Sequence, residues 1–93
     1  MTVGILSVRI VIRDSHSLKD KRRVISSLKD RIRQRFNVSL SEMGSRDHHQ
    51  QCLMGIAMVG NDRKHVNSTL SILVNFFKSF PKVELVDYNL ELM

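Results

Sequence analysis

Residues 15–36 hold most of the positive charge of this chain, and positive charge at such density binds anions. The basic residues of the segment are Lys19, Lys21, Arg22, Arg23, Lys29, Arg31, Arg33 and Arg35. Only Asp20 and Asp30 oppose them, so the excess of positive charge in this segment equals the formal net charge of the chain, +6 at pH 7. Nucleic acids and anionic membrane surfaces are the large polyanions of a cell, so the segment predicts a class of partner.

Part of this basic segment is suited to contact a phosphate backbone. The candidate residues are Lys19, Arg22, Arg23, Lys29 and Arg33, whose spacing places them on the solvent side of a helix. A solvated helix whose charges serve only solubility has the same periodicity and stays an alternative, but the scarcity of acids favours an anion-binding face. Membrane adsorption is disfavoured, because the apolar side of the helix is needed by the fold and has no aromatic anchor.

Imidazole and thiol side chains raise the question of a metal site. The candidate ligands are His16, His48, His49, Cys52 and His65. Imidazole and thiolate suit zinc, but the spacings match none of the paired-ligand zinc patterns. We therefore expect loop histidines and a buried thiol, with no metal and no other cofactor.

The tripeptide Asp14-Ser15-His16 contains the residue types of a catalytic triad. A triad is defined by its geometry, however, and no nucleophile elbow or cysteine-enzyme signature is present. A phosphate pocket between Arg13 or His16 and Asn61 would be expected to need a glycine-rich loop, which the chain lacks. We expect the protein not to be an enzyme.

Length and composition bound the setting of the protein. The 93 residues predict a single domain over residues 1–93, with a modest core. The single cysteine excludes an internal disulfide. A secretory start is absent, as is an apolar span of roughly 20 residues, and we expect a cytoplasmic protein that does not enter a membrane.

Hydrophobic periodicity predicts six elements that position these residues. Strands are predicted over residues 2–13, 37–43, 52–59 and 83–92, helices after Ser17 and after Asp62, and a turn or loop over residues 44–50. Ser17 can cap the first helix, with Asp20 three positions later, and Pro81 ends the second helix.

Two apolar patterns bear on the packing of these elements. The strand over residues 52–59 is almost continuously apolar, which suits a central strand buried on both faces, and Gly55 and Ala57 would give a facing helix room to approach. In the second helix, Ile72, Phe76 and Phe80 form a second apolar stripe. The stripe could bind a protein partner, but we favour core packing or a contact between two copies of the chain.

The order of the elements, βαββαβ, predicts an α+β fold of the ferredoxin-like type, a four-stranded antiparallel sheet with two helices on one face. The other face of such a sheet is left open. Val3, Ile5 and Val11 of the first strand can point to that open face. Since large exposed apolar patches are uncommon on monomers, we expect these residues to form the interface of a homodimer or to bind another partner.

Four motifs in order along the chain resemble the YlxP-like family of small bacterial proteins. They read SHSLKDKR at residues 15–22, RFNVS at 35–39, GIA at 55–57 and NDRKHV at 61–66. The resemblance implies a ferredoxin-like fold in a cytoplasmic bacterial protein, no settled activity, and genes that often lie near those of translation and ribosome maturation. The family tends to carry an aspartate followed closely by Trp-Gln where this chain reads Asp47, His48, His49 and Gln50, so His49 stands where the aromatic is expected.

These observations lead to one functional hypothesis and one alternative. The hypothesis is a non-enzymatic module, associated with RNA or a ribosomal subunit, that docks on the phosphate backbone through its first helix and acts in ribosome maturation or translation. Stacking of single-stranded bases is disfavoured, because the strand over residues 52–59 has no aromatic side chain. The alternative is a homo-oligomeric regulatory or assembly module that binds a protein or a small ligand through its sheet face.

Overall fold

The computed structural model describes residues 1–44 and 48–93, and it contains the six predicted elements in the predicted order. The strands are β1 (Thr2–Ile12), β2 (Ser39–Gly44), β3 (Gln51–Gly60) and β4 (Val83–Leu92), and the helices are α1 (Leu18–Arg35) and α2 (Arg63–Ser79). The predicted bounds of the strands agree with these to within two residues. The predicted loop over residues 44–50 includes residues 45–47, which lie outside the described residues.

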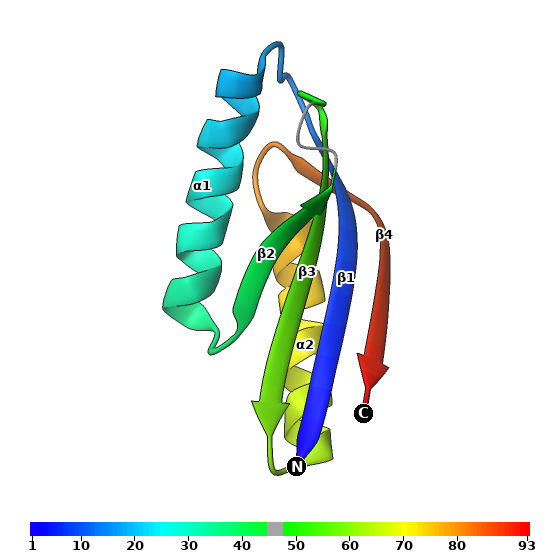
Figure 1. The fold of residues 1–93 in the computed structure, drawn as a ribbon. Coiled ribbons are helices and arrows are strands. Elements are labelled where there is room, and N and C mark those ends of the chain that lie inside the picture. The colour runs from blue at the N-terminus through cyan, green and yellow to red at the C-terminus, as the bar shows by residue number, and fades with distance from the viewer. Residues whose placement is uncertain (45–47) are drawn as a thin grey trace.

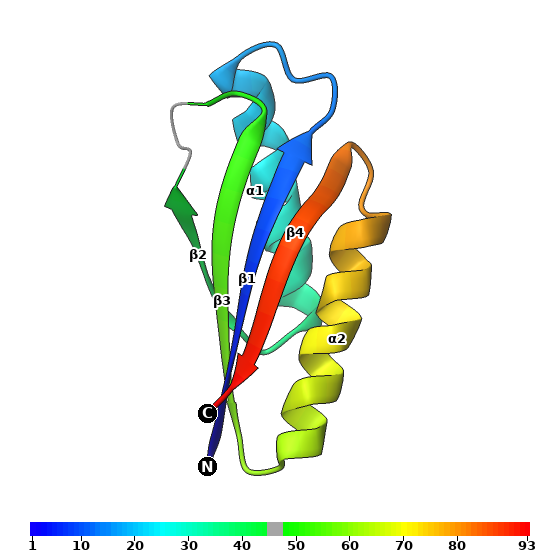
Figure 2. The same ribbon diagram turned by 90° about the vertical axis from the view of Figure 1, so that its right-hand side faces the viewer.

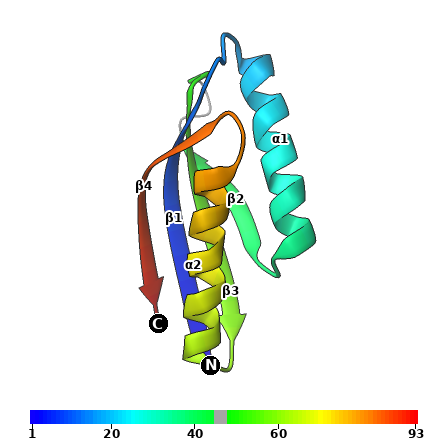
Figure 3. The same ribbon diagram turned by 180° about the vertical axis from the view of Figure 1, so that it is seen from behind.

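The four strands form one antiparallel sheet in the order β2-β3-β1-β4, so β1 and β3 are the central strands. Both helices lie on the same face of this sheet (Figures 1 and 3), and the opposite face, which we call the open face, carries no element of the described chain. Figure 2 shows β2 and β4 as the two edge strands. The ferredoxin-like prediction is confirmed.

The hydrophobic core fills the space between the sheet and the helices. Strand residues of one parity point into it because successive side chains of a strand alternate between faces. The fully buried members include Leu6, Ile10, Ile12 and Ile56 of the sheet, Leu28 and Ile32 of α1, and Leu70, Leu73 and Phe77 of α2. This packing fixes which side of each helix is turned toward solvent.

Glycines at one end of the sheet let α2 approach closely. A Cβ atom on Gly4 would lie 2.5 Å from Leu70 Cδ1, and one on Gly60 would lie 2.7 Å from a methyl group of Val66. Gly55 and Ala57, in contrast, point to the open face, where the nearest side chain to Gly55 is the exposed Met43. The prediction that these two residues make room for a helix is therefore wrong.

β3 is buried on one face only, which corrects the prediction of a strand buried on both faces. Ala57 is exposed, and the side chain of Val59 is 62% exposed. The apolar run is real, but the two helices share one side of the sheet and leave the second set of apolar side chains in contact with water.

The second apolar stripe of α2 divides into a packed part and an exposed part. Phe76 meets Phe36, at the end of α1, edge to face with ring centroids 5.9 Å apart, and Phe80 lies 5.7 Å from Phe76. Both side chains pack against the core, as the packing interpretation predicts. Ile72 does not join them and stays 53% exposed.

Candidate nucleic-acid interface

Helix α1 begins at a hydrogen-bonded cap, as its sequence predicts. The Ser17 hydroxyl accepts a bond from the backbone N–H of Asp20 at 3.1 Å, and the carboxylate of Asp20 accepts one from the backbone N–H of His16. The latter bond favours the charged form of the carboxyl and lowers the pKa of Asp20. The cap and the buried side chains of Ile25 and Leu28 together fix the rotation of α1 on the sheet.

Four cations of α1 lie on the side of the helix that faces away from the sheet. They are Lys19, Arg22, Arg23 and Arg33, all exposed, and we call them the outward cations. Within residues 1–44 and 48–93, none of them forms an ion pair. The first three line a shallow depression of about 570 Å³ together with Ser26, Ser27 and Asp30. This stripe can accept an anionic ligand without first giving up a protein partner.

Lys29 does not belong to this stripe, although its spacing predicted a position on the solvent side. Its Nζ lies 2.8 Å from Oε1 of Glu42 on β2, and the two side chains are only 24% and 22% exposed. The prediction for the position of Lys29 is wrong, because the lysine crosses from α1 to the edge strand and is neutralised there.

The remaining cations of α1 also have local roles. Arg35 lies over the rings of Phe76 and Phe36, with its guanidinium carbon 5.3 and 5.5 Å from their centroids, and Arg31 lies 5.9 Å from the centroid of Phe80. These are cation–π distances. Lys21 is buried, and its amine donates to the carbonyl oxygen of His48 at 2.8 Å. Half of the basic residues of the segment are thus turned toward the protein.

The turn between β1 and α1 is covered by residues 48–50. The hydroxyl of Ser15 donates to the carbonyl oxygen of His49, and Nδ1 of His49 lies 3.1 Å from the carbonyl oxygen of Ser15. The backbone N–H of Ile12 donates to the carbonyl oxygen of Gln50 at 2.7 Å. His49 therefore packs on the backbone of this turn, at the position where the family tends to carry an aromatic residue.

The histidines and the cysteine do not converge. In the part of the chain that the structure describes, no three His, Cys, Asp or Glu side chains gather closely enough to hold a metal ion. Cys52 is fully buried in the core, and desolvation raises the pKa of its thiol to about 11. A thiol in this state is a poor nucleophile and a poor metal ligand at neutral pH.

The open face holds the three residues predicted for an oligomer interface. Val3, Ile5 and Val11 all point to it and are partly buried by their neighbours on the same face. The structure adds two residues that the sequence reasoning missed, Arg9 of β1 and Asp87 of β4, which lie opposite each other in the register of the two neighbouring strands. The alternation of side chains along β1 could have identified Arg9, because Arg9 has the same parity as Ile5 and Val11 and so points to the same face.

Membrane insertion through a helix finds no support among the described residues. Neither α1 nor α2 is long and apolar enough to cross a bilayer.

Comparison with known proteins gives a consistent result over most of the chain. The sequence pattern of the family described as "Protein of unknown function (DUF503)" matches residues 3–90. A relative from Bacillus subtilis (strain 168), "Uncharacterized protein YlxP", is 37% identical over 82 residues, which cover 88% of this chain and 89% of the relative.

Two de novo designed proteins are among the solved structures that match this chain. The de novo designed protein Foldit4 matches 100% of this chain and 94% of its own, with a TM-score of 0.51 and 14% identity. LFR1 1, a second de novo design, with a ferredoxin fold, matches 100% of this chain and 83% of its own at a TM-score of 0.44 and 14% identity.

Proposed function

This chain belongs to the YlxP-like family, described as DUF503, and from the geometry of α1 we propose that it binds the phosphate backbone of RNA through the outward cations. The observation that carries the proposal is their arrangement on one exposed stripe of one helix, with no competing ion pair among the described residues. Binding requires only that the positively charged side chains can reach the phosphates of the RNA.

The length of the stripe fits several phosphates. Lys19 and Arg33 are 14 positions apart on α1, which at a rise of 1.5 Å per residue is about 21 Å. Backbone phosphates of one strand of a duplex follow one another at about 3.4 Å along its axis, so the stripe spans about six of them. Four flexible cations over this length can each reach a different phosphate.

The sheet favours backbone contacts over readout of bases. No aromatic side chain of β1 or β3 is available for stacking, because these strands contain none. Tyr88 of β4 lies beneath the amine of Lys78 on the helix side, 5.9 Å from the ring centroid. Since single-stranded RNA is read largely by stacking on aromatics, structured RNA is the better partner. Ribosomal RNA is the first to test, because the resemblance implies gene neighbours in translation and ribosome maturation.

The test is fluorescence anisotropy of labelled ribosomal RNA fragments titrated with the protein over a series of salt concentrations, beside a DNA duplex of equal length. Arg22→Gln/Arg33→Gln is expected to weaken RNA binding about tenfold or more at low salt. It should also lower the slope of log K against log salt by about 1 for each lost phosphate contact. Unchanged affinity in this folded double variant would overturn the proposal.

A matched control removes the same charge elsewhere. Arg63 and Lys64 are exposed at the start of α2, which lies at the opposite end of the elongated molecule from the start of α1 (Figure 1). Arg63→Gln/Lys64→Gln has the same net charge as the test variant and is expected to keep most of the affinity. Equal losses in both variants would mean that only net charge matters, and equal, salt-labile binding to RNA and DNA would argue against a role specific to RNA.

A further inference from the structure

The open face of the sheet carries a patch of apolar side chains that no element of the described chain covers. Alternate residues of both central strands and one residue of β2 contribute to it: Val3, Ile5 and Val11 from β1, Leu53, Ala57 and Val59 from β3, and Met43 from β2. Val59 and Met43 are 62% and 68% exposed. Contiguous apolar patches of this kind mark interaction sites.

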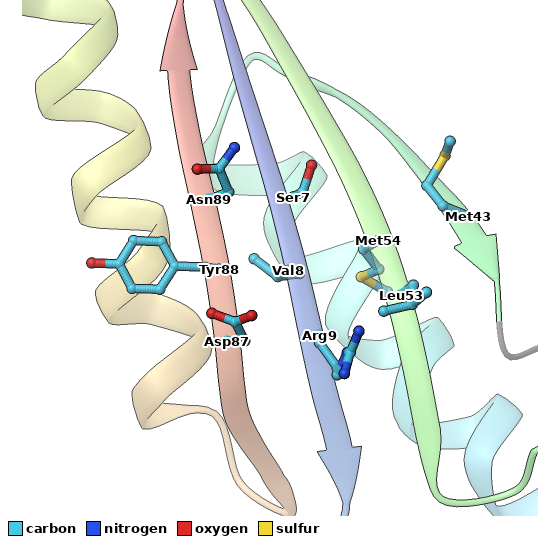
Figure 4. Close-up of a pocket in the computed structure, with 9 residues that line it drawn as sticks. All are labelled: Ser7, Val8, Arg9, Met43, Leu53, Met54, Asp87, Tyr88 and Asn89. Carbon is cyan, nitrogen blue, oxygen red and sulfur yellow. The ribbon is translucent and has the colours of Figure 1, made fainter.

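A hollow lies in this face around Ser7 of β1. The partners of Ser7 on the neighbouring strands are Gly55 of β3 and Asn89 of β4, and Asn89 also lines the hollow. The hollow has a volume of about 330 Å³, and Figure 4 shows Met43 and Leu53 along one side of it and Asp87 and Asn89 along the other. The hollow therefore has apolar side chains along one side and polar side chains along the other, which a second surface can complement.

Opposite charges border the hollow without meeting. Arg9 and Asp87 are direct partners on β1 and β4, yet neither forms an ion pair with any described residue. The other acids that β4 turns to this face are engaged: Glu84 pairs with Arg13 at 3.6 Å, and Glu91 accepts a bond from Asn89. Among the described residues, the open face thus offers one unpaired cation, Arg9, and one unpaired anion, Asp87, on the same row.

We propose that two copies of the chain associate through their open faces, with Arg9 of each copy paired to Asp87 of the other. A two-fold interface is isologous and must hold both members of every complementary pair on one surface, as this face does. A two-fold axis that runs along the strands, between the two sheets, sets each row of one copy against the same row of the other. Where this axis passes between β1 and β4, Arg9 of one copy lies opposite Asp87 of the second copy.

The open face as a whole is close in size to one side of a standard interface. Four strands of six to eleven residues, at about 4.8 Å spacing and about 3.3 Å per residue, give a flat area of about 600 Å². Protruding side chains make the accessible area larger. Standard interfaces bury about 800 Å² from each partner. Face-to-face packing of two twisted sheets at about −30° is a common arrangement that covers such a surface.

Sedimentation velocity over a wide range of protein concentrations tests the proposal, with circular dichroism as the check of folding. The wild-type chain is expected to form a dimer. Arg9→Asp and Asp87→Arg each place like charges across the interface and are expected to raise the dissociation constant about tenfold or more. The double variant Arg9→Asp/Asp87→Arg restores the complementary pair and is expected to recover most of the association.

Two further variants separate this interface from a general effect of charge. Val59→Asp puts a carboxylate among the apolar residues of the open face and is expected to dissociate the dimer, whereas Arg63→Asp, on α2, is expected to leave it intact. A wild-type chain that stays monomeric overturns the proposal and leaves the face to another protein or a small ligand. Failure of the double variant to recover association overturns the pairing of Arg9 with Asp87. The sedimentation readout contains no RNA, so it is independent of the proposed function.

Discussion

Lys29 and Glu42 form an ion pair between α1 and the edge strand β2, with 2.8 Å between Nζ and Oε1 and three quarters of each side chain buried. An ion pair at this depth is screened less by water than one at the surface. It also neutralises one of the cations that the charge pattern had assigned to a nucleic-acid surface. The same residue type thus has two roles on one helix, and the direction of each side chain decides which.

Replacing Lys29 by methionine is expected to affect stability more than RNA binding. The variant leaves the partly buried Glu42 carboxylate without its lysine partner, which should lower the free energy of unfolding by about 1 kcal/mol. Urea denaturation measures this loss, and the anisotropy titration measures RNA affinity beside Arg22→Gln, which removes one outward cation. If Lys29→Met weakens RNA binding as much as Arg22→Gln does, Lys29 belongs to the binding surface after all.

Cys52 gives the protein a predictable sensitivity to alkaline pH. Burial raises the pKa of its thiol from 9.0 to about 11, with a further contribution from the charge of Glu42. Above pH 9 the unfolded chain loses the thiol proton while the folded chain keeps it, so the stability that this group contributes is complete below pH 9 and declines up to about pH 11. The decline should approach about 1.4 kcal/mol per pH unit.

The comparison of wild type with Cys52→Ala isolates this effect from other groups that titrate in the same range. Urea midpoints at a series of pH values from 8 to 11 are expected to converge, because only the wild type loses the contribution of the thiol. Parallel profiles for the two proteins would show that the thiol is not buried as the structure has it.

Gly4→Ala is expected to destabilise the contact between β1 and α2. The added methyl group would lie 2.5 Å from Leu70 Cδ1 and 2.6 Å from Val66 Cγ1, both in fully buried side chains. Overpacking of this kind costs about 1–3 kcal/mol. Gly55→Ala is the matched control, because its methyl group meets only the exposed side chain of Met43, at 3.1 Å, which can move aside. Equal urea midpoints for the two variants would contradict this account.

Lys21→Met is expected to loosen residues 48–50 from the turn between β1 and α1. The buried amine donates to the carbonyl oxygen of His48, and loss of such a bond costs about 1–3 kcal/mol. Amide hydrogen exchange should accelerate at Ile12, whose N–H donates to Gln50. Lys19→Met, an exposed neighbour on α1, serves as the control and should leave this exchange unchanged. Similar exchange at Ile12 in both variants would show that Lys21 does not hold the segment.

Local sequence signals predicted the elements well but not the faces on which residues lie. Ser17 and Asp20 are close in sequence, and their cap needs no knowledge of the rest of the chain. Gly55 lies on a strand with apolar residues on both faces, so its parity does not reveal which face the helices cover. That assignment depends on the pairing of β3 with β1, where Gly55 meets Ser7.

The side-chain partners of the candidate sites depend on contacts between distant residues. Lys29 lies beside the buried Leu28, but its partner Glu42 is on another element and no periodicity connects the two. The pairing of Arg9 with Asp87 depends on a shift of register between Arg9 and Ile10, whose partners are Asp87 and Leu85. Alternation of side chains along β4 does not predict this irregularity. One extra residue in the strand reverses the face to which every later side chain points.

The placement of both helices on a single face of the sheet determines how the proposed dimer presents its two RNA-binding helices. If two copies join through their open faces, their α1 helices lie on opposite outer sides and point away from each other. The two α1 helices of such a dimer cannot bind one short duplex at the same time. It would instead act as a bridge between two separate RNA segments, with a gain in avidity only for an RNA long enough to reach around it.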